Sequence, residues 1–166
     1  MGALLALIGG GVFLYSGIYP VAADVHHSRL TYWVLETLRE RSISRAASAI
    51  KVPWDLGGSE RLLAGGADYN DMCATCHLKP GKSESDFTLG LYPTPPNLTV
   101  ATDDVDTKLQ DKKSSGEKGL KRDFWVIKHG IKASGMPAWG PTHDDQRIWN
   151  MVAFIQKLPE LTPAQY

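Results

Sequence analysis

The chain has 166 residues, enough for one modest domain with an extension but too few for two complete hydrophobic cores. Its 18 basic and 18 acidic side chains balance, so the totals give no support to nucleic-acid or other polyanion binding. Only two cysteines occur, which is too few for a disulfide framework, so any chemistry they carry is local.

The first predicted element is an apolar segment at the N-terminus. No charged side chain occurs over the 21 residues from Ala3 to Ala23. As a helix at about 1.5 Å per residue this stretch would reach roughly 31 Å, the thickness of a bilayer's hydrocarbon core. We therefore predict a transmembrane anchor helix over residues 1–23. The alternative is a secretory signal cut near the small residues that follow Val21, although the apolar run is longer than is usual for a signal.

Residues 24–55 are predicted to form an amphipathic helix and a linker. From Ser28, which can cap the helix, to Ile50, apolar side chains recur at helical spacing while arginines lie off this stripe. Two placements remain open for the helix. It packs on the domain or on a partner subunit, or it lies on a membrane surface with Trp33 at the level of the lipid headgroups.

Residues 56–166 are predicted to form the folded domain. Ser59 is expected to cap a helix that runs over residues 59–77. Residues 78–100 are rich in proline, glycine and serine and show no periodicity, so we predict a loop. Residues 101–122 are almost entirely polar with charges of both signs, which indicates an exposed insertion or, alternatively, an element that docks a partner.

Two further helices are expected in the rest of the chain. One opens at Asp123 and ends at Gly130, and the last begins at a cap on Thr142 or Asp144 and runs to Pro159. No internal repeat occurs, and no alternating apolar run is long enough to predict a sheet. The predicted fold class is therefore all-α.

Both cysteines belong to the sequence Cys73-Ala74-Thr75-Cys76-His77, a Cys-x-x-Cys-His motif. On a helical turn, two thiols at this spacing reach the two vinyl groups on one edge of a porphyrin, and the next imidazole reaches the iron. The motif predicts one covalent haem c, bound through Cys73 and Cys76, with His77 as an iron ligand. A thioredoxin-like dithiol is an alternative that would need a strand–helix context. A zinc site would need further ligands at suitable spacing.

Met136, in the sequence SGMPAWG, is the best candidate for the second axial ligand of the iron. A thioether favours Fe(II) and raises the reduction potential relative to two histidine ligands, and the flanking glycine and proline indicate a tight loop that aims one side chain. Filling the core is the alternative for this methionine. His129, at a predicted helix end, is the rival ligand. The adjacent His26 and His27 are too few for a metal site, and His143 is predicted to lie on the surface.

These motifs resemble the class I cytochrome c family over roughly residues 56–166. Gly65 and Tyr69, eight and four positions before the first cysteine, match family positions that face the C-terminal helix, and Phe154 matches an aromatic in that helix. The resemblance therefore implies a class I cytochrome c domain around one covalent haem.

The stretch Pro95-Pro96-Asn97-Leu98 is similar to a family segment whose proline carbonyl accepts a hydrogen bond from the iron-ligating histidine. The resemblance implies that Pro96 orients the ring of His77 in this way, and that Pro96 and Leu98 belong to the haem-binding residues. The Met-Pro-Ala-Trp-Gly loop is similar to that of bacterial members, including cytochrome subunits of haem–copper oxidases and of periplasmic dehydrogenases.

The function expected from these features is single-electron transfer, without catalysis by the chain itself. The leading hypothesis is a carrier tethered to the bacterial inner membrane, with the haem domain in the periplasm and respiratory redox proteins and membrane lipid as partners. A fixed cytochrome subunit of a larger oxidase or dehydrogenase is the alternative. A haem peroxidase or gas sensor is a third, which would need an open iron position. Four lysines near the ligand motifs could steer an acidic partner: Lys79, Lys82, Lys128 and Lys132.

The orientation across the membrane is predicted with one conflict. Arg29, Arg39, Arg41 and Arg45 follow the apolar segment, and the positive-inside rule would place them in the cytoplasm. Haem attachment in the resembling family takes place on the outer side, which favours the periplasm.

Overall fold

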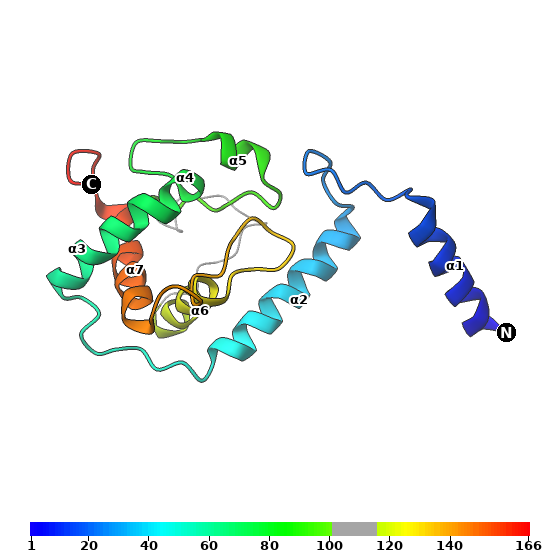
Figure 1. Ribbon diagram of the computed structural model, residues 1–166, viewed down its shortest axis with the longest axis horizontal. Coiled ribbons are helices and arrows are strands. Elements are labelled where there is room, and N and C mark those ends of the chain that lie inside the picture. The colour runs from blue at the N-terminus through cyan, green and yellow to red at the C-terminus, as the bar shows by residue number, and fades with distance from the viewer. Residues whose placement is uncertain (101–115) are drawn as a thin grey trace.

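The computed structural model describes residues 1–100 and 116–166, and within these ranges every regular element is helical and none is a strand. Helices α3 (Ser59–Asp68) and α7 (Asp145–Lys157) pack against each other on the side of the domain away from α1 (Figure 1). Helix α6 (Glu117–His129) packs against α7, and α2 (Arg29–Ala47) packs against α6. A short 3₁₀ turn, η3 (Leu158–Glu160), follows α7. The predicted all-α class is confirmed for the described residues.

Gly65 sets how closely α3 and α7 approach. A Cβ atom at this position would lie 2.0 Å from the carbonyl oxygen of Asn150 on α7, so the crossing requires a residue without a side chain. One turn further on, the ring of Tyr69 lies 5.4 Å from the ring of Phe154. The largest fully buried side chains gather around this crossing: Tyr69, Ile148, Met151, Val152 and Leu158.

The predicted helix over residues 59–77 is present, although it is not regular throughout. After α3 the chain makes a π-helical turn, η1 (Tyr69–Cys73), and continues directly into α4 (Ala74–His77). The prediction that Ser59 caps this helix is wrong. Gly58 holds the cap position, and no side chain accepts a hydrogen bond there, because the helix begins one residue earlier in the register than the serine pattern indicates.

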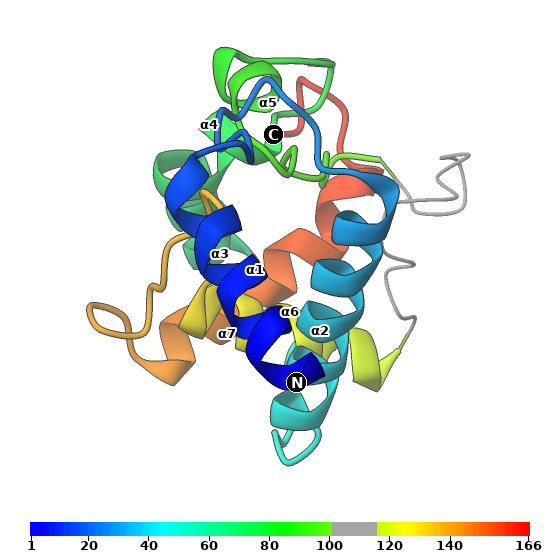
Figure 2. The same cartoon turned by 90° about the vertical axis from the view of Figure 1, so that its right-hand side faces the viewer.

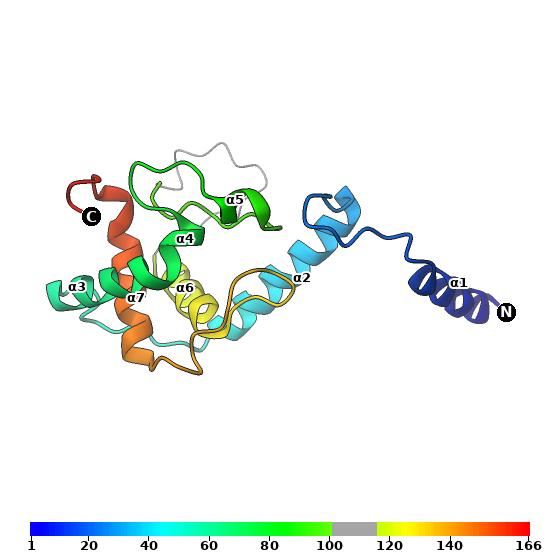
Figure 3. The same ribbon diagram turned by 45° about the horizontal axis from the view of Figure 1, so that its top comes forward.

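One short helix lies where only loop was predicted. Helix α5 (Asp86–Gly90) begins with a reciprocal capping box, in which Ser85 Oγ accepts from the Thr88 amide at 3.2 Å and Thr88 Oγ1 accepts from the Ser85 amide at 2.7 Å. The remainder of segment 78–100 is irregular. It follows α4 in the chain and lies with α4 and α5 on the same side of the domain (Figure 3).

Helix α6 begins earlier than predicted. Residues 101–115 of the predicted insertion lie outside the described residues, but Glu117–Arg122 form the first half of α6, so that part of the insertion prediction is wrong. The charged pattern there is one face of an amphipathic helix: Gly119 is buried, and Lys121 pairs with Glu117 at 2.8 Å. The predicted end is confirmed, with Gly130 at φ 64°.

Two of the predicted caps are confirmed. The Thr31 amide donates to Ser28 Oγ at 3.2 Å at the start of α2, which ends at Ala47, three residues before the predicted Ile50. The Arg147 amide donates to Asp144 Oδ1 at 2.8 Å, so of the two candidates it is Asp144 that caps α7.

The N-terminal helix α1 (Gly2–Ser16) projects away from the domain and buries none of its side chains (Figures 1 and 2). The predicted helix over residues 1–23 is wrong in its extent, because Gly17 takes a left-handed conformation with φ 63° and Pro20 follows. Within residues 1–100 and 116–166, no helix has both the length and the hydrophobicity that crossing a membrane requires.

Candidate functional site

The Cys-x-x-Cys-His motif lies where the π-helical turn passes into α4. Cys73 ends the turn and is buried, Cys76 and His77 belong to α4, and both of these side chains are partly buried. Leu78 follows with φ 71°, a conformation that ends the helix and turns the chain into segment 78–100. The three residues predicted to bind haem therefore lie within five positions of one another, where the π-helical turn passes into α4.

Tyr69 holds the end of this turn from inside the core. Its hydroxyl lies 2.8 Å from the carbonyl oxygen of Leu78 and 3.1 Å from that of His77, and the side chain is fully buried. Burial raises the pKa of Tyr69 far above its usual range, so the phenol stays protonated and remains a donor. The family resemblance led us to expect contact with α7, which the Phe154 ring provides, but not these two hydrogen bonds.

The imidazole of His77 is oriented by segment 78–100. Its Nδ1 donates to the carbonyl oxygen of Pro96 at 2.9 Å, and the Leu98 amide donates to the carbonyl oxygen of His77 at 3.2 Å. Burial lowers the pKa of His77, while the hydrogen bond to Pro96 opposes this shift, so the ring is held neutral with its proton on Nδ1. This leaves the lone pair of Nε2 available to a metal.

The two thiols lack the electrostatics of a redox dithiol. Burial, followed by the nearby Asp68 charge, raises the pKa of Cys73 to about 12, and burial also raises the pKa of Cys76. Reactive dithiols instead have a lowered thiol pKa, because the thiolate is the nucleophile. Both thiols are free in the structure. This environment disfavours the thioredoxin-like alternative.

Met136 lies in a loop that is tied to the end of α6. The amides of Trp139 and Gly140 donate to the carbonyl oxygens of Ile127 and Lys128 at 3.1 and 2.9 Å, and the Ile131 amide donates to the Met136 carbonyl oxygen at 3.2 Å. The Met136 side chain is partly buried and packs against the core cluster that contains Cys73. The loop therefore directs its one soft ligand toward the same core as the motif.

The loop that carries Met136 also meets segment 78–100. A Cβ atom at Gly135 would lie 2.9 Å from the side chain of Leu91, which directly follows α5. Since segment 78–100 carries the carbonyl group that orients His77, both candidate axial ligands are positioned by two loops in contact with each other. A haem at this place would be held by His77 from α4 and by Met136 from its loop.

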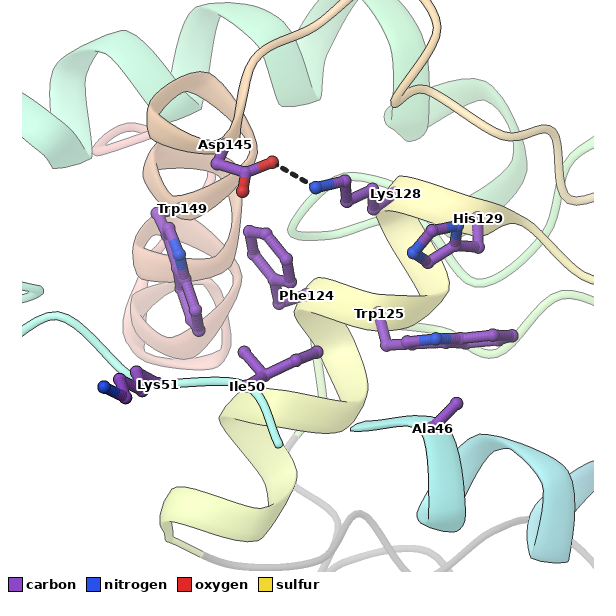
Figure 4. Close-up of a pocket in the computed structure, with 9 residues that line it drawn as sticks. All are labelled: Ala46, Ile50, Lys51, Phe124, Trp125, Lys128, His129, Asp145 and Trp149. Atoms are coloured by element: carbon purple, nitrogen blue, oxygen red, sulfur yellow. Dashed lines mark hydrogen bonds and ion pairs between the residues drawn. The ribbon is translucent and has the colours of Figure 1, made fainter. Parts of the chain in front are cut away.

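His129, the rival axial ligand, lies in different surroundings. It is exposed, its ring centroid lies 5.0 Å from that of Trp125, and it lines a cavity of about 400 Å³ between α2, α6 and α7 (Figure 4). Lys128 Nζ lies 2.5 Å from Asp145 Oδ1 at the edge of this cavity. None of the predicted haem-binding residues lines it. The geometry favours Met136 over His129 as the partner of His77.

The remaining histidines contact aromatic and hydroxyl groups. His27 Nδ1 lies 2.5 Å from the Tyr19 hydroxyl, and the rings of both His26 and His27 lie 5.1 Å from the Tyr92 ring. No group of three or more metal-ligating side chains of the His, Cys, Asp or Glu type occurs among residues 1–100 and 116–166. The zinc alternative therefore has no support in this part of the chain.

His143, predicted to lie on the surface, is partly exposed, and one of its ring atoms is buried. Its Nδ1 lies 2.8 Å from Thr142 Oγ1 and its ring packs edge-on against Trp139, whereas Nε2 is buried with no partner among the described residues. No signal in the sequence pointed to this burial.

The side chains at the motif fit a covalently attached haem. The thiols are three positions apart across the junction of the π-helical turn and α4, Nε2 of His77 has no hydrogen-bond partner among the described residues, and its Nδ1 donates to Pro96. A thioether ligand lies in the adjoining loop at Met136. A haem bound here supplies an iron that gains or loses one electron.

The helical fold and this site define a c-type cytochrome domain. A protein-family model described as cytochrome c oxidase, cbb3-type, subunit III matches residues 60–155, and the chain belongs to this family. A search of curated proteins and a search of solved structures each gave no match. Family membership confirms the predicted class I cytochrome c relationship, and it carries with it covalent haem c and electron transfer.

Proposed function

We propose that this chain is a mono-haem electron carrier whose haem domain works in the bacterial periplasm, tethered to the inner membrane through residues 1–23. The observation that carries the electron-transfer role is the hydrogen bond from His77 Nδ1 to the Pro96 carbonyl oxygen at 2.9 Å. This bond fixes the imidazole next to Cys73 and Cys76 with Nε2 directed away from its protein partner. One haem is proposed because the chain holds one Cys-x-x-Cys-His motif and no other cysteine.

The residues proposed as axial ligands suit a carrier better than a catalyst. His77 and Met136 would occupy both axial positions, so no position would remain for oxygen or peroxide. Both are held by hydrogen bonds within the protein: His77 by Pro96, and the Met136 amide by Ser134 Oγ at 3.1 Å. Rigid ligands keep the reorganisation on electron transfer small, which is what a carrier needs.

The tether is proposed from the character of the N-terminal segment. No charged side chain occurs between Ala3 and Ala23, and α1 exposes all of its apolar side chains. Apolar surface of this extent is costly in water and favourable in lipid. A tethered carrier searches a surface for its partners instead of a volume, which raises their effective concentration.

Of the four lysines predicted to steer an acidic partner, two have partners within the protein. Lys128 pairs with Asp145, and Lys79 Nζ donates to Asn70 Oδ1 at 2.7 Å and lies over the Tyr166 ring. Lys82 and Lys132 are exposed and have no ion-pair partner among the described residues. We therefore propose Lys82 and Lys132 as the charges that guide redox partners.

A second candidate is a fixed cytochrome subunit of a larger membrane oxidoreductase. The family that matches residues 60–155 is described as a subunit of a cytochrome c oxidase, and this description favours the second candidate. In this case α1 and the exposed face of α2 would be assembly contacts.

Extraction of native membranes in mild detergent separates the two candidates. A carrier is expected to elute at the size of the 166-residue chain in its micelle and to be reduced and reoxidised by added membrane complexes. A subunit would elute with other polypeptides at fixed stoichiometry. Co-elution that persists at high ionic strength would contradict the carrier proposal.

A further inference from the structure

One side of helix α2 packs against the domain. Ile43 and Ala47 are 2% and 4% exposed where α2 meets α6, and the Arg122 guanidinium of α6 lies 3.1 Å from Glu40. These residues recur at intervals of three and four, so they define one stripe along the helix. The residues of the opposite stripe are exposed.

The first half of that opposite stripe is apolar. Leu30, Val34 and Leu38 follow one another at intervals of four residues and are 70%, 47% and 66% exposed. Trp33 and Leu35 flank them at 63% and 47%. A contiguous apolar surface of this kind on a folded domain indicates a binding surface, since scattered exposed apolar residues would not align along one helix.

The second half of the same stripe is basic. The predicted single apolar stripe with the arginines off it is wrong: Ile43 and Ala47 are buried against α6, whereas Arg41 and Arg45 continue the exposed side of Leu30, Val34 and Leu38. Both arginines are exposed, and neither has an ion-pair partner among the described residues. A hollow of about 520 Å³ opens along this part of α2, and the described residues that line it include Leu38, Arg41 and Arg45. Apolar side chains and free guanidinium groups therefore share one surface.

We propose that this outward stripe of α2, from Leu30 to Arg45, lies on a lipid surface rich in anionic headgroups. The inference rests on the proposed tether, since α1 brings α2 to the membrane. Leu30, Val34 and Leu38 enter the boundary between headgroups and acyl chains, Trp33 lies at the headgroup level, and Arg41 and Arg45 contact lipid phosphates. Because α2 is fixed to α6, this contact sets how the haem domain faces the membrane.

The charge on the stripe favours lipid over a protein partner. A protein interface typically has an apolar centre with a mixed polar rim, whereas here only positive charge follows the apolar residues, with no carboxylate among Leu30, Val34, Leu38, Arg41 and Arg45. This arrangement matches an anionic lipid surface, whose negative charge lies above an apolar layer. Attachment to α1, which is uncharged and apolar, points to the same occupant.

A spin label at residue 34 tests the inference on the full-length haem-loaded chain. Val34→Cys supplies a unique reactive thiol, since Cys73 and Cys76 are the only other cysteines and the haem engages both. Glu60→Cys on α3, which lies far from α1 in Figures 1 and 3, is the matched control, and Leu7→Cys reports on α1. Vesicles are made from phosphatidylcholine with and without phosphatidylglycerol.

On anionic vesicles the label at 34 is expected to lose collisions with a water-soluble nickel chelate severalfold and to gain collisions with oxygen, while the label at 60 does not change. The variant Arg41→Gln/Arg45→Gln is expected to lower the affinity of this surface for anionic vesicles by about fivefold for each arginine removed, and so to reduce the shielding of the label at 34. Arg29→Gln, at the start of α2, controls for the loss of charge alone.

Three outcomes overturn the inference. A label at 34 that stays accessible to the chelate while the label at 7 is shielded shows a tether without surface contact by α2, and leaves the proposed tether standing. If neither label is shielded, the tether fails as well. Shielding at 34 in native membranes but not in anionic vesicles assigns the stripe to a protein partner.

Discussion

Two residues outside the Cys-x-x-Cys-His motif determine how its last residue is held. Pro96 accepts a hydrogen bond from the His77 ring, and Tyr69 donates to the backbone carbonyl oxygens of His77 and Leu78. The motif itself, and Pro96 through the family resemblance, are readable from the sequence because they are local patterns. The hydrogen bonds of Tyr69 could not be predicted from the sequence, because they depend on a π-helical turn that no sequence pattern indicates.

Removing the Tyr69 hydroxyl is expected to destabilise the fold around the motif. Tyr69→Phe leaves the carbonyl oxygen of Leu78 without its hydroxyl donor, whereas that of His77 keeps the Leu98 amide, and we expect a cost of about 1–2 kcal/mol in the free energy of unfolding. Denaturant titration of the haem-loaded protein measures this. Tyr166→Phe, whose hydroxyl makes a long 3.4 Å contact with Asn70 at the surface, is the control and is expected to stay within about 0.5 kcal/mol of the parent.

Replacing Met136 tests the proposed sixth ligand. The parent, once reduced, is expected not to bind carbon monoxide rapidly and, once oxidised, to show the weak far-red band of methionine ligation. Met136→Ala is expected to lose the band and to bind carbon monoxide quickly. Met72→Leu is the control, because Met72 is also partly buried against the core, and it should retain both properties of the parent. A parent protein that binds carbon monoxide at once would instead support a sensor or peroxidase.

For the secondary-structure elements, the sequence predicts helix ends correctly where a capping residue borders a run of apolar residues at helical spacing. The starts of α2 at Ser28 and of α7 at Asp144, and the end of α6 at Gly130, were predicted correctly. The start of α6 was missed because its first turns are nearly all polar, and their burial depends on α2 and α7, which only the folded chain brings near. The helix over residues 1–23 was predicted too long because hydropathy was given more weight than Gly17 and Pro20.

The crossing of α3 and α7 gives a sharp test of the fold. Gly65→Ala places a methyl group 2.0 Å from the Asn150 carbonyl oxygen, so the two helices must separate. We expect a loss of about 3 kcal/mol or more in the free energy of unfolding. Gly57→Ala, where an added Cβ atom meets nothing within 4 Å, is the matched control and should be close to neutral. Equal effects of the two substitutions would contradict this packing.

Over the whole molecule acidic and basic side chains balance, but some of the lysines near the site already have partners within the protein. With Lys79 and Lys128 engaged, Lys82→Glu/Lys132→Glu is expected to slow electron transfer to a native membrane acceptor about tenfold at low ionic strength. The difference should shrink as salt rises, because charges are screened beyond about 10 Å at 0.1 M. Lys51→Glu/Lys118→Glu makes the same charge change at exposed positions elsewhere. If both variants slow transfer equally, steering by Lys82 and Lys132 is wrong.

The covalent bond between the chain and its haem is the most direct test of the whole account. The protein is denatured, extracted with acidified organic solvent and weighed by mass spectrometry, alongside Cys73→Ser/Cys76→Ser. We predict that the parent polypeptide keeps its haem absorbance and the mass of a single haem, and that the double variant releases or lacks it. A parent chain that surrenders its haem to the solvent, or that carries none, would contradict the account.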